Sequence, residues 1–211
     1  MKLYYSNTSP YSRKVRLFSR ESGLESQIEE IVINPFGNDK GELTRANPLG
    51  KIPTLLLDNG TALYDSPVIC YFLDSLLEQF TLIPATENMT ILKWQALADG
   101  MTDAAYNLAI ERRTRPREEQ SPKWIANWST EIQRALEYIE LHIDEIKRFE
   151  GDITLAHLAL ASAVSYLELR LPEILYESEC PQVSVCPNMM TWYEAFKTRP
   201  SMQSTVLHDV A

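Results

Sequence analysis

Apolar and polar positions alternate over short runs in the first 80 residues. Residues 2–5 (KLYY) and 28–33 (IEEIVI) are rich in aromatic and β-branched side chains, which is typical of strands. Residues 54–65 (TLLLDNGTALYD) hold two short apolar runs on either side of the turn sequence DNG, which indicates a β-hairpin. The pattern therefore predicts four short strands in this part of the chain.

Segments in which apolar residues recur at helical spacing lie between and after these strands. Residues 10–24 and 66–80 carry apolar stripes at steps of three and four, and a serine-proline pair stands at the start of each. Proline and glycine interrupt residues 34–50, which leaves room there for a short, irregular helix only. The predicted order is β-α-β-α-β-β-α, with a parallel strand pair from the first crossover and an antiparallel hairpin after it.

From residue 87 onward the pattern is helical throughout. Residues 124–149 form an amphipathic stripe, 154–171 are apolar almost all round, and 188–202 form a last amphipathic helix that ends at Pro200. The apolar segment predicts a buried central helix. We expect an α/β domain at residues 1–80 and an all-helical domain at 87–211, joined by a linker at 81–86.

Composition narrows the class of protein. Twenty basic and 29 acidic side chains give a net charge of −9, which argues against non-specific nucleic-acid binding. No apolar run is long enough to cross a membrane, and the start of the chain lacks the apolar core of a signal peptide. Cys70, Cys180 and Cys186 form no CxxC pair, and the three histidines show no metal-ligand spacing with them. We expect a cytoplasmic protein without a metal.

Residues 9–12 (SPYS) would read CPYC, the glutaredoxin active-site sequence, if both serines were cysteines. Without thiols, the site has lost disulfide chemistry. No histidine precedes residue 142, so a serine nucleophile activated by histidine is excluded within the first domain. The Ser9 hydroxyl can still donate a hydrogen bond to a bound thiolate, and the helix dipole acts in the same direction. The alternative is that Ser9 only caps the helix.

Two further motifs indicate ligand binding through the backbone. Ile52-Pro53 precedes a strand, and a cis bond there would turn the Ile52 N–H and C=O outward to pair with an extended peptide. Asp65-Ser66-Pro67 opens a helix, where free N–H groups favour an anion such as a carboxylate. The plain alternatives are a strand-initiating proline and a capping serine.

Four segments in this order, SPYSRKVRL, NPLGKIPTL, DSPVICYFL and GDITLAHLALA, resemble the soluble glutathione S-transferases over the whole chain. The similarity is greatest to the bacterial serine- or cysteine-type branch near zeta-, omega- and beta-like members. It implies a thioredoxin-like α/β N-terminal domain plus an all-α C-terminal domain. It also implies glutathione as cosubstrate, a small electrophile as second substrate, a role in detoxification and a homodimer.

The resemblance also implies roles for individual residues. Ser9 would support the thiolate, with Tyr5 as an alternative donor. The glutathione contacts would come from the following residues: Ile52 for the cysteinyl backbone, Pro53 as the cis residue, Ser66 for the γ-glutamyl carboxylate, Asp65 for the ammonium group, and Lys51 or, less favoured, Arg13 for the glycine carboxylate. Asp99 is a candidate to reach a neighbouring glutathione across the dimer.

The electrophile is expected to lie between the domains. Asp103, Tyr106, Asn107 and Ile110 recur at helical spacing, and Arg113 belongs to a cluster of arginines at 112–117. That cluster indicates either a preference for anionic cosubstrates or, more simply, a solvated helix end.

One position departs from the family pattern. Thr154 caps the predicted central helix, but His157 stands where the family usually has aspartate, so the capping box lacks its carboxylate. A neutral imidazole nitrogen is the available substitute. These residues predict a glutathione transferase that conjugates the thiolate to a soft electrophile. The alternatives are a glutathione-binding regulatory module without turnover, or a glutathione-dependent isomerase or dehalogenase.

Overall fold

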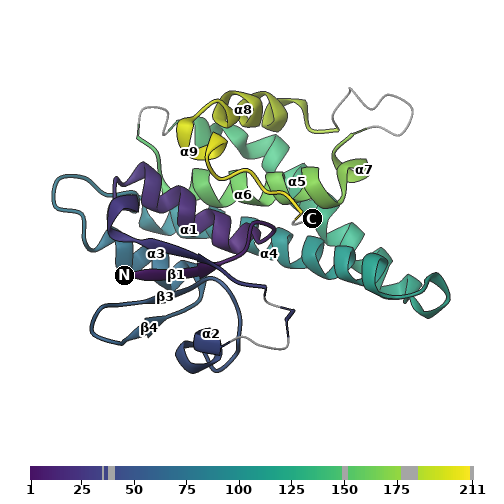
Figure 1. Ribbon diagram of the computed structural model, residues 1–211. Helices are drawn as coiled ribbons and strands as arrows, with labels where there is room; N and C mark the ends of the chain where they lie inside the picture. Colours follow the sequence, from purple (N-terminus) through teal and green to yellow (C-terminus); the bar gives the residue numbers. More distant parts are fainter. Residues whose placement is uncertain (35, 38–40, 149–151, 177–184, 210–211) are drawn as a thin grey trace.

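A computed structural model describes residues 1–34, 36–37, 41–148, 152–176 and 185–209. Its N-terminal part contains a four-stranded sheet in the order β2-β1-β3-β4 (Figure 1). β1 (Lys2–Tyr5) pairs in parallel with β2 (Glu29–Val32) and antiparallel with β3 (Thr54–Leu56), which pairs antiparallel with β4 (Ala62–Leu63). The predicted crossover and hairpin are confirmed.

The helices of this part begin close to the expected residues. They are α1 (Pro10–Glu21), α2 (Gly41–Ala46) and α3 (Ser66–Asp74), with a 3₁₀ turn η1 (Glu25–Gln27) after α1. The prediction that the third helix continues to residue 80 is wrong. The Asp74 carboxylate accepts hydrogen bonds from the Thr81 hydroxyl at 2.6 Å and the Leu82 N–H at 2.8 Å, which turns the chain away from the helix axis.

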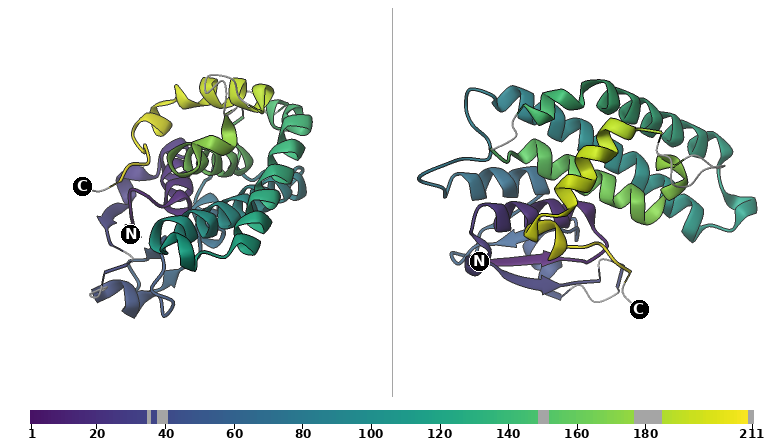
Figure 2. Two further views of the ribbon diagram at one scale, coloured as in Figure 1. Left: turned by 90° about the vertical axis from the view of Figure 1, so that its right-hand side faces the viewer. Right: turned by 90° about the horizontal axis from the view of Figure 1, so that it is seen from above.

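The C-terminal part is helical. Its elements are α4 (Asn88–Thr114), η2 (Arg117–Glu119), α5 (Pro122–Lys147), α6 (Leu155–Arg170), α7 (Pro172–Leu175), α8 (Pro187–Lys197) and α9 (Pro200–Gln203). α4 and α5 pack along each other and extend past the sheet (Figures 1 and 2). Within the described ranges, no helix has both the length and the hydropathy required to cross a bilayer.

α6 is the predicted central helix. Its residues from Leu155 to Leu167 are all buried, and it packs against α4 and α1. The chain therefore combines a thioredoxin-like α/β N-terminal domain with an all-α C-terminal domain around one continuous hydrophobic core. α4 begins at Asn88, and residues 81–86 remain our proposal for the linker between the domains.

The start of α6 contains the histidine that replaces the usual aspartate. Nδ1 of His157 accepts a hydrogen bond from the Thr154 N–H at 3.2 Å and lies 2.9 Å from the Thr154 hydroxyl oxygen. The ring also bonds to the backbone of Ile146 at the end of α5, and burial lowers the pKa of His157 to about 4. The neutral imidazole thus completes the capping box, as expected for the substitute acceptor.

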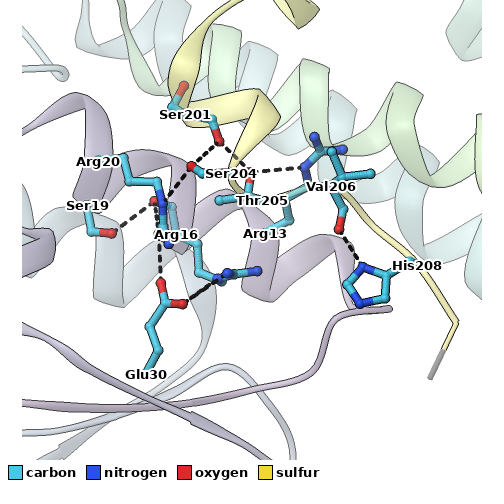
Figure 3. A network of polar contacts seen from close by, with 10 residues as sticks. All are labelled: Arg13, Arg16, Ser19, Arg20, Glu30, Ser201, Ser204, Thr205, Val206 and His208. Atoms are coloured by element: carbon cyan, nitrogen blue, oxygen red, sulfur yellow. Dashed lines mark hydrogen bonds and ion pairs between the residues drawn. The ribbon is translucent and has the colours of Figure 1, made fainter. Parts of the chain in front are cut away.

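α1 joins the two domains through its basic side chains. Lys14 is buried and its ammonium group lies 2.7 Å from both carboxylate oxygens of Asp99 on α4. On another side of α1, the C-terminal segment 204–209 runs along the helix in the opposite direction (Figure 1). The contacts Arg20–Ser204 and Arg13–Thr205 mark its course (Figure 3).

Candidate active site

Ser9 stands where β1 has ended and α1 begins. Its backbone is extended (φ −85°, ψ 116°), its side chain is half-buried, and Oγ accepts a hydrogen bond from the Ser12 N–H at 3.1 Å. The helix cap expected from the sequence is therefore present. Because a hydroxyl oxygen has two lone pairs and one proton, this cap leaves the Ser9 O–H free to donate. Capping and thiolate binding are thus compatible in one side chain.

The strand register brings two other predicted segments to the same edge of the sheet. Tyr4 pairs with Thr54 and Leu55 pairs with Leu63. Continuing these antiparallel registers places Ile52 beside the turn that follows β1 and Asp65 beside Pro53. The start of α1, the residues before β3 and the start of α3 therefore meet at one end of the sheet.

Ile52 presents an open backbone edge there. The Ile52–Pro53 bond is cis, as expected, and the Tyr64–Asp65 bond is cis as well. The Lys51 carbonyl accepts bonds from Asn47 and Thr54, but within the described chain neither the N–H nor the C=O of Ile52 has a partner. An extended peptide has the right groups to occupy this edge.

α3 has Asp65 as its N-cap and Ser66 as its first residue, whereas the sequence indicated Ser66 itself as the capping residue. Ser66 is buried at 1% exposure, and its hydroxyl has no hydrogen-bond partner among the residues described. The Asp65 carboxylate is exposed and likewise makes no ion pair with any of them. A helix N-terminus with a free hydroxyl suits a carboxylate, and the adjacent Asp65 suits an ammonium group.

The two basic candidates for the glycine carboxylate differ in position. Lys51 is exposed next to the open edge of Ile52. Arg13 is buried, and its guanidinium donates to the Met202 carbonyl at 3.0 Å and to the Thr205 hydroxyl at 3.4 Å. Its charge faces the C-terminal segment, so the placement of Arg13 in the glutathione site is withdrawn and Lys51 is retained.

Tyr5 lies in the hydrophobic core with 7% of its surface exposed, beneath the Arg16 guanidinium at 4.3 Å from the ring centre. This position supports core packing, the alternative to a donor role.

The sequence analysis did not identify a different tyrosine that lies at this junction. The hydroxyl of Tyr11 donates a short hydrogen bond to the Asp103 carboxylate on α4, which bridges the two domains directly after Ser9-Pro10. Burial raises the pKa of Tyr11, and the bond to Asp103 adds to the shift.

The predicted electrophile-lining residues share the outer side of α4. Asp103 and Asn107 are exposed, whereas Tyr106 and Ile110 are half-buried. Tyr106 packs partly against the core, and burial raises its pKa. Because Tyr11 reaches Asp103, this side of α4 faces the start of α1 across the junction of the domains.

The arginine cluster is largely paired within the chain. Arg112 contacts Glu173 at 2.6 Å, Arg115 contacts Glu111 at 3.1 Å, and Arg113 lies 3.8 Å from Asp209. These pairs favour a structural explanation over recognition of an anionic cosubstrate. Asp99 is similarly occupied by Lys14, which removes the support for a contact with a neighbouring subunit's ligand.

The C-terminal segment also reaches the turn before Ser9, which the sequence pattern did not indicate. The His208 N–H donates to the Asn7 carbonyl at 3.2 Å, and Arg170 binds both Asp209 oxygens at 2.6 and 2.8 Å. The turn before Ser9 is further closed by the Ser9 N–H, which donates to the Ser6 carbonyl at 3.3 Å. Both ends of the turn are thus held by the fold.

Comparisons with known proteins agree with this geometry. A family model described as "Glutathione S-transferase, N-terminal domain" matches residues 8–76. The uncharacterised GST-like protein YibF of Escherichia coli K12 is 32% identical over 173 residues, which are 81% of this chain and 83% of that protein.

Two solved structures are similar over nearly their whole length. A glutathione transferase family member from Pseudomonas fluorescens Pf-5, with bound glutathione, is 33% identical with a TM-score of 0.87, covering 99% of each chain. A glutathione S-transferase from Methylobacillus flagellatus KT, also with glutathione bound, is 32% identical with a TM-score of 0.86, covering 98% of this chain and 99% of that one.

Proposed function

The chain belongs to the glutathione S-transferase family, and we propose that it holds glutathione as a thiolate through Ser9 and adds it to a soft electrophile. The observation that carries this proposal is the state of the Ser9 hydroxyl. Its oxygen is oriented by the Ser12 N–H, and its proton remains available at the N-terminus of α1. A thiolate placed there gains a hydrogen bond and the favourable end of the helix dipole.

We assign the other parts of glutathione to groups that have no partner among the described residues. The open edge of Ile52 accommodates the cysteinyl backbone, and Ser66 at the start of α3 accommodates the γ-glutamyl carboxylate. Asp65 takes the γ-glutamyl ammonium group and Lys51 the glycine carboxylate. The electrophile enters along the side of α4 that carries Asp103, Tyr106, Asn107 and Ile110.

A cytoplasmic homodimer is part of the same proposal. α3 exposes the apolar side chains of Val68 at 46% and Tyr71 at 42%. Exposed apolar side chains on one helix support an interface, and the family packs its sheet domain on the partner's helical domain. Light scattering at micromolar concentration tests this point; a monomer mass contradicts it.

The decisive experiment combines glutathione binding with turnover. Calorimetry measures the affinity for glutathione, and conjugation of chlorodinitrobenzene and a broader electrophile panel measures activity. We expect saturable binding, turnover, and a bound thiol that ionises at lower pH than free glutathione in an ultraviolet titration.

Other outcomes select the alternatives. Tight binding without turnover on the whole panel favours a regulatory module. Release of halide with glutathione regenerated favours a dehalogenase, and an isomerised product with glutathione unchanged favours an isomerase. Absence of glutathione binding contradicts the proposed conjugation and all three alternatives.

A further inference from the structure

A cavity of about 330 Å³ lies between α1, α6, α8, α9 and the C-terminal segment. Its polar wall is formed by Arg13, Glu168, Tyr193 and Lys197, and Met202 and Leu207 contribute to its apolar wall. None of the residues that we assign to glutathione or to the electrophile lines this cavity. It is therefore a separate feature of the molecule, and a ligand bound in it would be independent of the proposed transferase activity.

The guanidinium in this wall differs from the other basic groups of α1. Lys14 is paired with Asp99, and Arg16 and Arg20 are paired with Glu30 at 3.0 and 2.7 Å. Arg13 is 5% exposed, and no carboxylate of the described residues lies within 4.0 Å of it. In Figure 3, Glu30 lies below Arg16 and Arg20 and bonds to both, whereas Arg13 bonds to the Thr205 hydroxyl.

The neighbours of Arg13 are polar but do not neutralise it. Its nitrogens donate to the Met202 carbonyl and the Thr205 hydroxyl, and Tyr193 contributes a further hydrogen bond. Burial lowers the pKa of Arg13, although Tyr193 and the charge of Glu168 oppose the shift. A buried cation without a counter-charge is unfavourable, because the lost hydration is not replaced by an ion pair.

The other charges of the wall are already matched. The Glu168 carboxylate accepts from Lys197 at 3.1 Å and from the Tyr193 hydroxyl at 3.0 Å. Lys197 reaches Glu194 as well, at 2.9 Å. Lys197 is thus paired with two carboxylates, whereas Arg13, the other cation of the lining, forms no ion pair with any of the described residues.

We propose that this cavity binds a small monocarboxylate with an apolar tail. The planar guanidinium of Arg13 suits a carboxylate, with which it can form parallel hydrogen bonds. Met202 and Leu207 provide the surface for the apolar part. The volume lies at the lower end of ligand pockets, which span about 300–1,000 Å³, and this favours a small acid.

Octanoate is a suitable probe, and calorimetry with the full-length protein measures its binding with and without millimolar glutathione. We expect one octanoate per chain in both conditions. Arg13→Met should weaken binding at least tenfold, and Arg13→Lys, which keeps the charge but loses the planar fork, should weaken it less. Arg20→Met is the matched control, because Arg20 lies on the same helix outside the cavity; it should bind octanoate as the wild type does.

Thermal unfolding adds a readout that does not depend on octanoate affinity alone. Without octanoate, Arg13→Met should melt at the same temperature as the wild type or higher, because methionine fills similar space without a buried charge. Arg20→Met should melt lower, since Glu30 loses a partner. Octanoate should raise the melting temperature of the wild type and of Arg20→Met, but not of Arg13→Met.

Three results overturn the proposal. One is equal octanoate affinity in the wild type, Arg13→Met and Arg13→Lys. Another is octanoate that glutathione displaces, which places it in the transferase cleft. The third is absence of octanoate binding to the wild type at tens of millimolar. If Arg13→Met does not fold, Arg13→Lys carries the comparison.

Discussion

Helices α1 and α6 start in the same way but differ in which groups of their caps are paired inside the protein. Each is preceded by a hydroxyl residue in extended conformation, Ser9 with φ −85° and ψ 116° and Thr154 with φ −123° and ψ 165°. Ser9 is half-buried, and its proton has no partner in the described chain. Thr154 is 1% exposed, and its N–H and hydroxyl both face the His157 ring. The local sequence motif thus does not decide whether a cap serves chemistry or folding.

The difference depends on burial, because burial determines which hydrogen-bonding groups of a cap find partners inside the protein. At α6 the Thr154 N–H and hydroxyl both meet the His157 ring, which is stacked on Phe196 and tilted against Trp192 at centroid distances of 6.1 and 6.3 Å. At α1 one donor is left over at an edge where a ligand can approach. A cap that is complete stabilises the fold, whereas a cap with a spare donor can bind a substrate.

The largest expected effect lies at α6. Replacing His157 by alanine removes the capping acceptor and the ring between two aromatic side chains, so the free energy of unfolding should fall by about 3–4 kcal/mol. Urea unfolding measures it. His157→Asn keeps an acceptor but loses the ring and should fall between the wild type and alanine. A loss below about 1 kcal/mol for His157→Ala contradicts the assigned role.

Acid should weaken the same helix start without any mutation. His157 titrates near 6.5 when unfolded and at about 4 when folded, so the unfolded chain binds more protons between these values. The contribution of the neutral imidazole is complete above pH 6.5 and declines as pH falls toward 4. At pH 5 the loss should be roughly 2 kcal/mol. Urea unfolding at pH 7.5 and 5 should show it in the wild type, and the difference should shrink in His157→Asn.

A third helix start extends the comparison to ligand binding. Ser66→Ala at α3 removes a hydroxyl that we assign to the γ-glutamyl carboxylate, and glutathione binding should weaken by about 1–3 kcal/mol. Stability should change little, because the hydroxyl has no internal partner to lose among the residues described. Calorimetry decides the point: an unchanged dissociation constant moves the carboxylate to another site.

The smallest expected change in glutathione affinity, with the clearest chemical readout, is at Ser9. In the site that we propose, Ser9→Ala removes one hydrogen bond to the thiolate and leaves the contacts at Ile52 and Ser66, so glutathione affinity should change little. The pKa of the bound thiol should rise, by about one unit for each 1.4 kcal/mol of lost stabilisation. Conjugation near neutral pH should fall, and the deficit should shrink as pH rises.

Ser9→Cys is the complementary variant. It restores a thiol at a helix N-terminus, where thiolates are favoured, and should shift the protein toward mixed disulfides with glutathione. If Ser9→Ala leaves the ultraviolet titration of the bound thiol in place, Ser9 is only a cap. Tyr11 would then be the first hydroxyl to test, because it lies two residues away and bridges the domains.

Much of the secondary structure of this protein is determined by residues that are close together in the sequence. The cis Ile52–Pro53 bond was expected from the family resemblance, whereas the order of strands and helices, the serine-proline start of α1 and the buried character of α6 were predictable from the chain itself. Each depends on residues within one or two turns of chain, where hydrophobic period, backbone sterics and capping act directly. The site motifs could be found for the same reason, since backbone edges and helix starts are local features.

Tertiary structure alone decided where the long polar side chains point. Tyr11 bonds to Asp103, 92 residues away, Lys14 to Asp99, 85 residues away, and Arg13 faces Met202, 189 residues away. The Asp74 contacts that end α3 early are of the same kind, although closer in sequence. A charged side chain that is buried must find a partner, and the partner is whatever group the packing of distant helices brings within reach. For that reason the sequence offered Arg13 only as a less favoured candidate for the glycine carboxylate, and the fold decided that it faces Met202, Thr205 and the cavity beside α8.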